Sequence, residues 1–348
     1  MAGFTRQPRC TVNGYIPVEC SIHTSQHQTA DTFAATFALD DPATPGAAWW
    51  ANTAPINVTI MATNDAATGS MTQMFQGGVD KVDINWNKRL VEISGRDNTS
   101  EMLEAKTNEK WLNKQPQDII TDLAGRVGMT VQFSGTPPDR AGLRYNQDYN
   151  RISELDSYWN VIVRLAREMS CIAYVKGTVL YIQPWDYIGG GDFAITYVPP
   201  SATGAALGNV IKLATARDLV VAQDVEVTHQ SWQQKQGQAI ESKWYSAGTG
   251  GLFSHRLKAA NLTKQQQDAV AAGRLEEITS HERTLTFVTY GDVTLQPGMS
   301  VTLSGTGTAF DMTYVISDIE HNWSWAQGYL MTVNVRNKDP GRAKTQIK

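Results

Sequence analysis

The chain has 348 residues, of which 41% are hydrophobic and 18% charged, and this composition favours two or three folded domains over a disordered protein. The net charge of −4, without any Lys/Arg run, argues against a nucleic-acid-binding protein. Cys10, Cys20 and Cys171 are too few for a disulfide framework, which indicates folding in a reducing cytoplasm. The N-terminus lacks an apolar stretch and no window approaches about 18 apolar residues, so we expect no signal peptide, transmembrane helix or membrane anchor.

Residues 1–97 have the pattern of β-strands. Apolar and polar residues alternate in four short segments, which are 30–39, 56–63, 79–86 and 90–93. Turn-forming residues separate these segments, as in a sandwich or a barrel. We therefore expect a first β-barrel domain over residues 1–97.

Residues 98–200 change to a helical period. Asn98, with Glu101 three residues later, predicts a capping box at a helix start, and Pro116 predicts the first turn of a second helix. A third helical segment and a hairpin turning at residues 176–177 follow. We expect an inserted α+β domain with a core that contains Ile119, Ile120, Leu123, Trp159, Ile162 and Leu165.

Residues 201–348 return to a β pattern. Candidate strands include 209–214, 224–230, 284–290, 299–305, 312–321 and 328–336. A helical insertion is predicted near 255–281, starting at Asn261 or Thr263. We therefore expect a second β-barrel domain over residues 201–348. The predicted fold class is mainly β, with two similar β-barrel domains and an inserted α+β domain.

The two β regions contain an internal repeat. In 55–97 and in 297–339, a proline-led strand ends in Val-Thr and an aliphatic residue. A phenylalanine then precedes a strand that ends in Asn-Trp, and a further strand closes on a basic residue. We expect the two segments to have similar strand arrangements, with Trp86 and Trp323 in comparable positions.

Candidate ligand-binding patterns have simpler structural interpretations. The glycine-rich segments 189–191 and 304–310 lack the spacing of a phosphate-binding loop, so we interpret them as turns. His23 and His27 have a spacing that could hold a metal on a helix, but they lie near a strand end and no further Cys/His cluster completes a site. His321 is interpreted as a packed histidine rather than a general base.

Candidate catalytic patterns are equally weak. The acidic pairs are Asp80/Asp83 and Glu276/Glu277, and the tryptophan pairs are Trp49/Trp50 and Trp323/Trp325. Carboxylates could serve a glycosidase and tryptophans could stack on sugars, but solvated faces and packed aromatic residues explain both more simply. No serine lies in a GxSxG sequence. We predict no catalytic, cofactor-binding or metal-binding residues and no cofactor.

A family resemblance rests on five stretches taken together. They are VEISGRDNTSEML (91–103), KQPQDIITDLAGRVGMTV (114–131), SYWNVIVRLAREMSCIAYVKGTVLYIQPW (157–185), HERTLTFVTYGDVTLQPGMSVTLSG (281–305) and FDMTYVISDIEHNWSWAQGYLMTVNVR (310–336). In this order they resemble the baseplate hub proteins of contractile phage tails, including the late control protein D family and the tail protein P of Mu-like phages. The resemblance covers about residues 80–340.

The resemblance implies two β-barrel domains of the tail-tube type in each subunit and a homotrimeric ring of six similar barrels. Such a ring would meet the tail tube or tube-initiator proteins above, a trimeric spike below and baseplate wedge proteins at its side. DNA would pass without specific binding through a channel with a neutral or negative wall. The expected location is the virion baseplate, after assembly in the bacterial host cytoplasm.

We therefore expect a structural hub and not an enzyme. The alternative is a carbohydrate-binding tail protein or a glycan hydrolase on a β scaffold.

Overall fold

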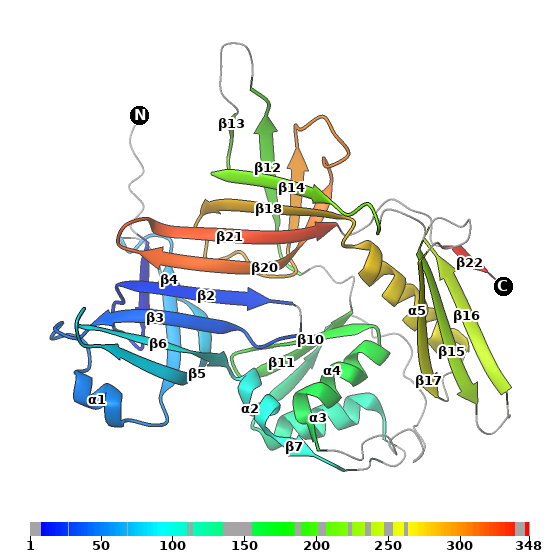
Figure 1. Cartoon of the computed structure of the whole chain (residues 1–348), viewed down its shortest axis with the longest axis horizontal. Coiled ribbons are helices and arrows are strands. Elements are labelled where there is room, and N and C mark those ends of the chain that lie inside the picture. The colour runs from blue at the N-terminus through cyan, green and yellow to red at the C-terminus, as the bar shows by residue number, and fades with distance from the viewer. Residues whose placement is uncertain are drawn as a thin grey trace.

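The structure is a computed structural model that describes residues 8–26, 28–67, 69–109, 111, 114–134, 155–184, 189–200, 207–221, 225–233, 238–246, 253–260, 264–337 and 345–347. Most of these residues lie in β-strands, so the prediction of a mainly β protein is confirmed (Figure 1). A large sheet of 13 strands forms the body of the molecule, and three smaller sheets accompany it.

The first β unit consists of β1 (Arg9–Val12), β2 (Glu19–Ser25), β3 (Thr32–Ala38), α1 (Ala47–Asn52), β4 (Asn57–Thr63), β5 (Thr72–Asn85) and β6 (Leu90–Asp97). The strands pair in the order β1-β4-β5-β6-β3-β2, and every pair is antiparallel. The alternation predicted from the sequence places Phe33, Ala35 and Phe37 of β3 in the core. The residues between them, such as Thr36, therefore face the other side of the sheet.

The second β unit consists of β12 (Asp192–Val198), β13 (Leu207–Gly208), β14 (Lys212–Arg217), β18 (Arg283–Tyr290), β19 (Ser300–Ser304), β20 (Thr313–Ser324) and β21 (Gly328–Asn337). Apart from the short edge strand β13, these strands pair in the order β12-β19-β20-β21-β18-β14. When strands are matched in chain order, this is the order of the first unit. One difference is that β12 runs parallel to β19, whereas β1 is antiparallel to β4.

The repeat predicted from the sequence therefore appears as a shared strand order. The burial of the two repeat tryptophans differs, because Trp86 is 61% exposed and Trp323 is 6% exposed. Among the described residues, the pairings do not close either unit into a ring of strands. The organisation into two barrels stays a prediction.

β2 and β20 join the two units into one sheet. They pair antiparallel from Glu19↔Ser324 to Ser25↔Asp318. Figure 1 shows the resulting series of strands from β14 at the top, through β20 and β2, to β5 at the bottom. One hydrophobic cluster includes Phe37 of the first unit and Phe287 of the second, so the two units share a core.

The α+β insertion consists of α2 (Thr99–Glu104), β7 (Lys106–Thr107), α3 (Pro116–Arg126), β8 (Thr130–Phe133), β9 (Asp156–Ser157), α4 (Tyr158–Glu168), β10 (Cys171–Lys176) and β11 (Val179–Pro184). It has its own three-stranded sheet, β10-β11-β8, and its own hydrophobic cluster. All six apolar residues predicted to be buried there are at most 3% exposed, which confirms that prediction. The hairpin turn uses residues 177–178, one position later than predicted.

Two strands fall in a different place from the one the sequence suggested. β12 lies within the range predicted for the α+β domain, yet it pairs with β19 in the large sheet. The strand predicted at 224–230 is β15 (Val225–Gln233), which belongs to a separate sheet. An alternating pattern identifies a strand but not its partners, and this explains both differences.

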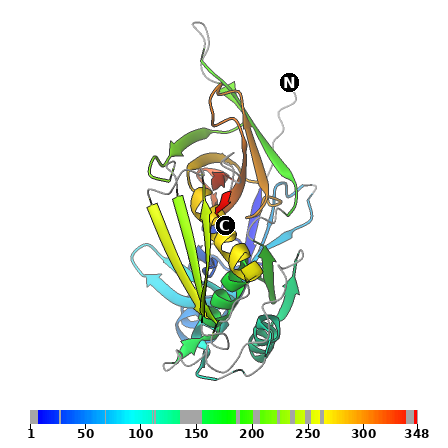
Figure 2. The same cartoon turned by 90° about the vertical axis from the view of Figure 1, so that its right-hand side faces the viewer.

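Three strands of that separate sheet form a second insertion, between β14 and β18. The strands of the sheet have the order β17-β15-β16-β22. β16 (Gln238–Tyr245) and β17 (Phe253–Ala260) lie beside β15, and β22 (Thr345–Ile347) pairs with β16. Helix α5 (Lys264–Thr279) lies against the sheet (Figures 1 and 2). Ala271 and Leu275 of α5 pack on Val225 and Val227. The sequence predicted the helix but not a sheet of its own.

Candidate functional site

The end of β6 connects the first β unit to the α+β insertion, and the sequence Gly95-Arg96-Asp97 lies there. Gly95 is required because a Cβ at this position would lie 2.0 Å from the carbonyl oxygen of Gly78 in β5. The close approach occurs beside a bulge in β5, where the register shifts between Val79 and Lys81. The bulge therefore brings the two strands together just before the chain leaves the sheet.

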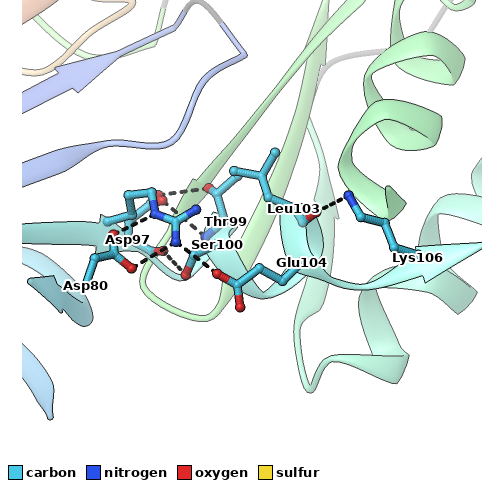
Figure 3. A network of polar contacts seen from close by, with 8 residues as sticks. Asp80, Asp97, Thr99, Ser100, Leu103, Glu104 and Lys106 are labelled. Atoms are coloured by element: carbon cyan, nitrogen blue, oxygen red, sulfur yellow. Dashed lines mark hydrogen bonds and ion pairs between the residues drawn. The ribbon is translucent and has the colours of Figure 1, made fainter. Parts of the chain in front are cut away.

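Arg96 links β5, β6 and α2 through its guanidinium group (Figure 3). Nε donates to Oδ2 of Asp80 at 2.6 Å, and Nη2 donates to Oδ1 of Asp80 at 2.8 Å. Nη2 also donates to Oε1 of Glu104 at 2.9 Å. The Arg96 hydrogen bonds hold the pKa of Asp80 below its usual range. A bidentate pair fixes direction as well as distance, so Arg96 orients α2 relative to the sheet.

Asp97 caps the start of α2. Its Oδ1 accepts from the backbone N–H of Thr99 at 3.1 Å, and its Oδ2 accepts from the Thr99 hydroxyl at 3.0 Å (Figure 3). The capping box predicted for Asn98 and Glu101 was wrong, since the Asn98 side chain makes no cap hydrogen bond. Instead, Asn98 Nδ2 donates to the carbonyl oxygen of Gly177 at 2.8 Å. The helix begins where the sequence predicted, but its neighbour supplies the cap.

Two carboxyl groups lie close together at this junction, with Asp97 buried and Asp31 half-buried. The backbone N–H of Asp97 donates to the carbonyl oxygen of Asp31 at 2.9 Å, and Asp31 Oδ1 accepts from the Ser25 N–H at 2.9 Å. Burial raises the pKa of Asp97 to about 7. Burial, with the nearby Asp97 charge, raises the pKa of Asp31 well above its ordinary value. Both carboxyl groups therefore keep their protons to a higher pH in the folded protein than exposed aspartic acids do.

A pocket opens beside this pair, where both β units meet the β10–β11 hairpin. Asp31, Lys176, Gln296 and His321 contribute to its lining. Lys176 Nζ donates to Gln296 Oε1 at 2.9 Å, and burial lowers the pKa of this lysine. The contact ties the hairpin to the loop that precedes β19. These interactions position three parts of the chain relative to one another.

Three of the four acids singled out in the sequence, Asp80, Asp83 and Glu277, form ion pairs near the surface. Asp80 binds Arg96, and Asp83 lies 2.6 Å from Lys81 Nζ. Glu277 binds Arg274 on the same helix. Opposite charges, rather than a second carboxylate, face these acids.

The histidines have structural partners. His321 is buried and its Nδ1 lies 2.8 Å from the Tyr329 hydroxyl, while its ring stacks on Trp323. Burial lowers the pKa of His321 to about 4, so the ring is neutral near pH 7. His23 Nε2 lies 3.7 Å from Asp318, and His27 lies outside the described residues. Within the described ranges, no three His, Cys, Asp or Glu residues are placed to hold a metal ion.

Of the two glycine-rich segments, which the sequence predicted to be hairpin turns, the one at 304–310 lies in a hairpin between β19 and β20. The one at 189–191 lies between β11 and β12, which belong to different sheets. Residues 305–310 connect β19 to β20, and residues 189–191 precede β12. In the connection between β19 and β20, the Asp311 side chain accepts hydrogen bonds from Thr306 and Gly307. Trp50 is buried and stacks on Phe37 of the core, so it presents no sugar platform. Among the described helices, none is long and apolar enough to cross a membrane.

One end of the large sheet carries exposed apolar side chains that the sequence did not reveal. The pairings align the start of β2 with the end of β20, and the start of β21 with the end of β18 (Figure 1). Large apolar residues that are at least 43% exposed lie at these strand ends and their turns: Ile16, Trp86, Ile211, Tyr290 and Trp325. Their gathering depends on strand pairing, so periodicity alone could not predict it. Exposed apolar groups of this kind are typical of interaction surfaces.

No protein-family model matches the chain, and no curated protein matches it in sequence. Solved structures do match its fold. A tail protein from Neisseria meningitidis MC58 has a TM-score of 0.66 at 14% identity, covering 95% of this chain and 96% of that one. The 43 kDa tail protein of prophage MuSo2 from Shewanella oneidensis has a TM-score of 0.65 at 13% identity, covering 96% and 99% of the two chains.

The chain has the fold of these phage tail proteins. The same tail-protein fold is found in the Escherichia coli c3393 protein, with a TM-score of 0.58 at 11% identity over 98% of this chain and 79% of that one. That protein is a component of a type VI secretion system, with structural similarity to the T4 tail proteins gp27 and gp5. In the tail-protein fold of the present chain, the junction at Arg96 and Asp97 connects the large sheet to its α+β insertion.

Proposed function

We propose that the chain is a structural hub of a contractile phage tail baseplate. Three copies form a ring of six similar β units that connects the hexameric tail tube to the trimeric central spike. The observation that carries this proposal is the strand order shared by the two β units. Two related units in each of three subunits give pseudo-sixfold symmetry, so one ring can match a sixfold partner and a threefold partner.

The exposed apolar strand ends support axial contacts with other tail proteins. They lie at one end of the sheet and include residues of both units, such as Ile16 and Trp325. The partners proposed for the ring are the tail tube or its initiator, the spike and the neighbouring wedge proteins. The fold shared with phage tail proteins supports a location in the virion baseplate, after assembly in the host cytoplasm.

The proposed role is mechanical rather than enzymatic. The buried groups at the junction hold the α+β insertion, and three of the candidate acids, Asp80, Asp83 and Glu277, are paired with Arg96, Lys81 and Arg274. DNA passes through a neutral or negative channel that the net charge of −4 favours. We further propose barrel domains over 1–97 and 201–348 and an α+β domain within 98–200, with β12 assigned to the second barrel.

Native mass spectrometry of the purified full chain over a range of concentrations tests this proposal. The expected species has three times the subunit mass of 38.3 kDa. A closed species of six subunits would contradict the pseudo-sixfold arrangement, because it would contain twelve β units. A chain that stays monomeric at every concentration, with and without tail-tube and spike proteins, would also contradict it.

A further inference from the structure

The two β units share their irregularities as well as their strand order. The β5–β6 register shifts at Asp80, and the β20–β21 register shifts at Ser317. When these two bulges are matched, Asn85 of β5 corresponds to Asn322 of β20, and Trp86 corresponds to Trp323. The units can therefore be compared residue by residue.

The same comparison extends to β2 and β14. Glu19 of β2 pairs with Thr36 of β3, and Lys212 of β14 pairs with Val288 of β18. Because Thr36 and Val288 occupy matching positions relative to β6 and β21, Glu19 corresponds to Lys212. Continuing along the strands, Cys20 to His23 of β2 correspond in order to residues 213–216 of β14.

The pairing of β2 with β20 joins the two β units within one chain, and we call this pairing the joint. The outer edge of β20 pairs with β19 at residues 313–315 and then with β2 at residues 318–324. β2 in turn lies between β3 and β20. Each strand of this joint therefore has a neighbour on both sides.

The counterparts of these two strands each have an open edge within the described part of the chain. β14 pairs with β18 alone. The outer edge of β5 pairs with β4 up to Gly78, and residues 81–85 of β5 have only β6 beside them. The two open edges are the two halves of the joint that β2 and β20 complete (Figure 1).

Burial shows the same difference. Trp323 is 6% exposed, and its counterpart Trp86 is 61% exposed. Ile22 of β2 is 0% exposed, whereas its counterpart Thr215 in β14 is exposed. Residues that occupy equivalent positions in the two units are buried at the joint between β2 and β20 and exposed at the open edges of β5 and β14.

We propose that β14 of one copy pairs antiparallel with the outer edge of β5 in a second copy, as β2 pairs with β20 within one chain. This inference rests on the proposed ring and names the seam that closes it. Transferring the register of Glu19↔Ser324 gives three specific pairs across the seam: Lys212 with Asn87, Ala214 with Asn85, and Ala216 with Asp83. Trp86 then becomes covered, as Trp323 is.

Two separate hydrogen bonds agree with this register. The Asp218 N–H donates to the Glu282 carbonyl oxygen, so alternation along β14 directs the backbone groups of Thr215 away from β18. The Gln26 N–H donates to the Ser317 carbonyl oxygen, so alternation along β2 directs the backbone groups of Ile22 toward β20. Thr215 is the counterpart of Ile22. The backbone groups of Ile22 point to β20 of the same chain, and those of Thr215 point to the open edge of β14, where the proposed seam lies.

A disulfide cross-link in the full chain tests the seam. Ala214 and Asn85 form a pair without mutual hydrogen bonds in the proposed register, a geometry with Cα atoms about 4.5 Å apart that permits a disulfide. The double variant Ala214→Cys with Asn85→Cys should form covalent oligomers up to a closed trimer on oxidation. Native Cys10, Cys20 and Cys171 are buried and free, so the wild-type chain serves as the background control.

The matched control is Ala214→Cys with Ile84→Cys, because adjacent strand residues face opposite sides of a sheet. This pair should cross-link at least about ten-fold less. Equal cross-linking of the two pairs would overturn the register. A trimer by native mass with no cross-link between positions 214 and 85 would overturn the seam and leave the proposed ring standing. A monomer at every concentration, with no cross-link, would overturn both.

A second pair of variants tests the seam without new cysteines. Trp86→Ser should abolish the trimer, whereas Trp325→Ser should leave it intact, since Trp325 is 78% exposed but lies outside the proposed pairing. Circular dichroism should show both variants folded. A trimeric Trp86→Ser variant would count against the seam, and loss of the trimer in both variants would assign the contact to the apolar strand ends instead.

Discussion

The two β units end in nearly the same residues, Arg96-Asp97 and Arg336-Asn337, but use them differently. Arg96 is partly exposed and binds Asp80 and Glu104, whereas Arg336 is 4% exposed and burial lowers its pKa to about 10. Asp97 caps α2, which follows its strand. Asn337 accepts from the N–H of Arg283 and donates to the carbonyl oxygen of Thr279, the last residue of α5.

The same strand end therefore anchors an inserted helix in both units. In the first unit the anchor is a carboxyl group with a raised pKa, and in the second it is an amide that does not titrate. The difference indicates that a duplicated framework was adapted at the points where insertions attach. It also indicates that only the first anchor responds to pH.

The largest expected change in stability comes from a substitution in the core of the α+β insertion, which is separate from the core of the β units. Leu165 is 1% exposed in the core of the insertion, so Leu165→Asp buries an unpaired charge and should lower the free energy of unfolding by about 3–5 kcal/mol. Urea denaturation measures it. Leu155→Asp is the control, because Leu155 is 70% exposed and should change stability by less than about 0.5 kcal/mol. Equal effects of the two changes would contradict a separate core.

A smaller loss of stability is expected when Asn337, the anchor of the second unit, is replaced by aspartate, the residue type of the first anchor. Asn337 is 0% exposed, and its Nδ2 donates to Thr279. Asn337→Asp replaces this donor by an acceptor unless the new carboxyl group keeps its proton, so stability should fall by about 1–3 kcal/mol at neutral pH and recover in acid. Unfolding curves at several pH values test this. Asn57→Asp, at an exposed asparagine of β4, is the control. A loss that does not depend on pH would contradict the comparison.

The reverse change, Asp97→Asn in the first unit, tests how the stability of the protein depends on pH. The pKa of Asp97 is raised to about 7 in the folded state from 3.8, so the folded protein holds one more proton than the unfolded chain between these values. Its contribution to stability is therefore lost as the pH rises from about 4 to 7, by at most about 1.4 kcal/mol per pH unit. Asp97→Asn should reduce this slope, while Asp31 retains its own part of it. An unchanged slope in stability measurements would show that Asp97 is ionised in the fold.

The smallest effect is expected at Arg96. Arg96→Lys keeps the charge but removes the bidentate contact with Asp80, and a partly exposed pair of this kind contributes no more than about 1 kcal/mol. Thermal unfolding at low and high salt measures the change, which should shrink as salt screens the wild-type pair. Arg89→Lys, at an exposed pair with Asp40, is the control and should have no measurable effect. A large, salt-independent loss would indicate a different role for Arg96.

The sequence predicted the features that depend on local periodicity. Alternation identified the buried face of β3, and helical spacing identified Leu165 and its neighbours as core residues. The choice of Asp97 over Asn98 as the cap could not be predicted, because both residue types cap helices and the distant Gly177 carbonyl engages Asn98. Trp86 and Trp323 share a local sequence pattern, yet among the strands that the structure describes only β2 covers one of them, Trp323.

The most direct test of a ring built from two equivalent β units is an electron cryomicroscopy reconstruction of tail tips that contain this chain. We expect three copies per tail, with six β units around one axis at the end of the tail tube, and a neutral or negative channel wall. Six copies per tail, a ring formed by only one of the two β units, or a strongly basic channel would contradict the account.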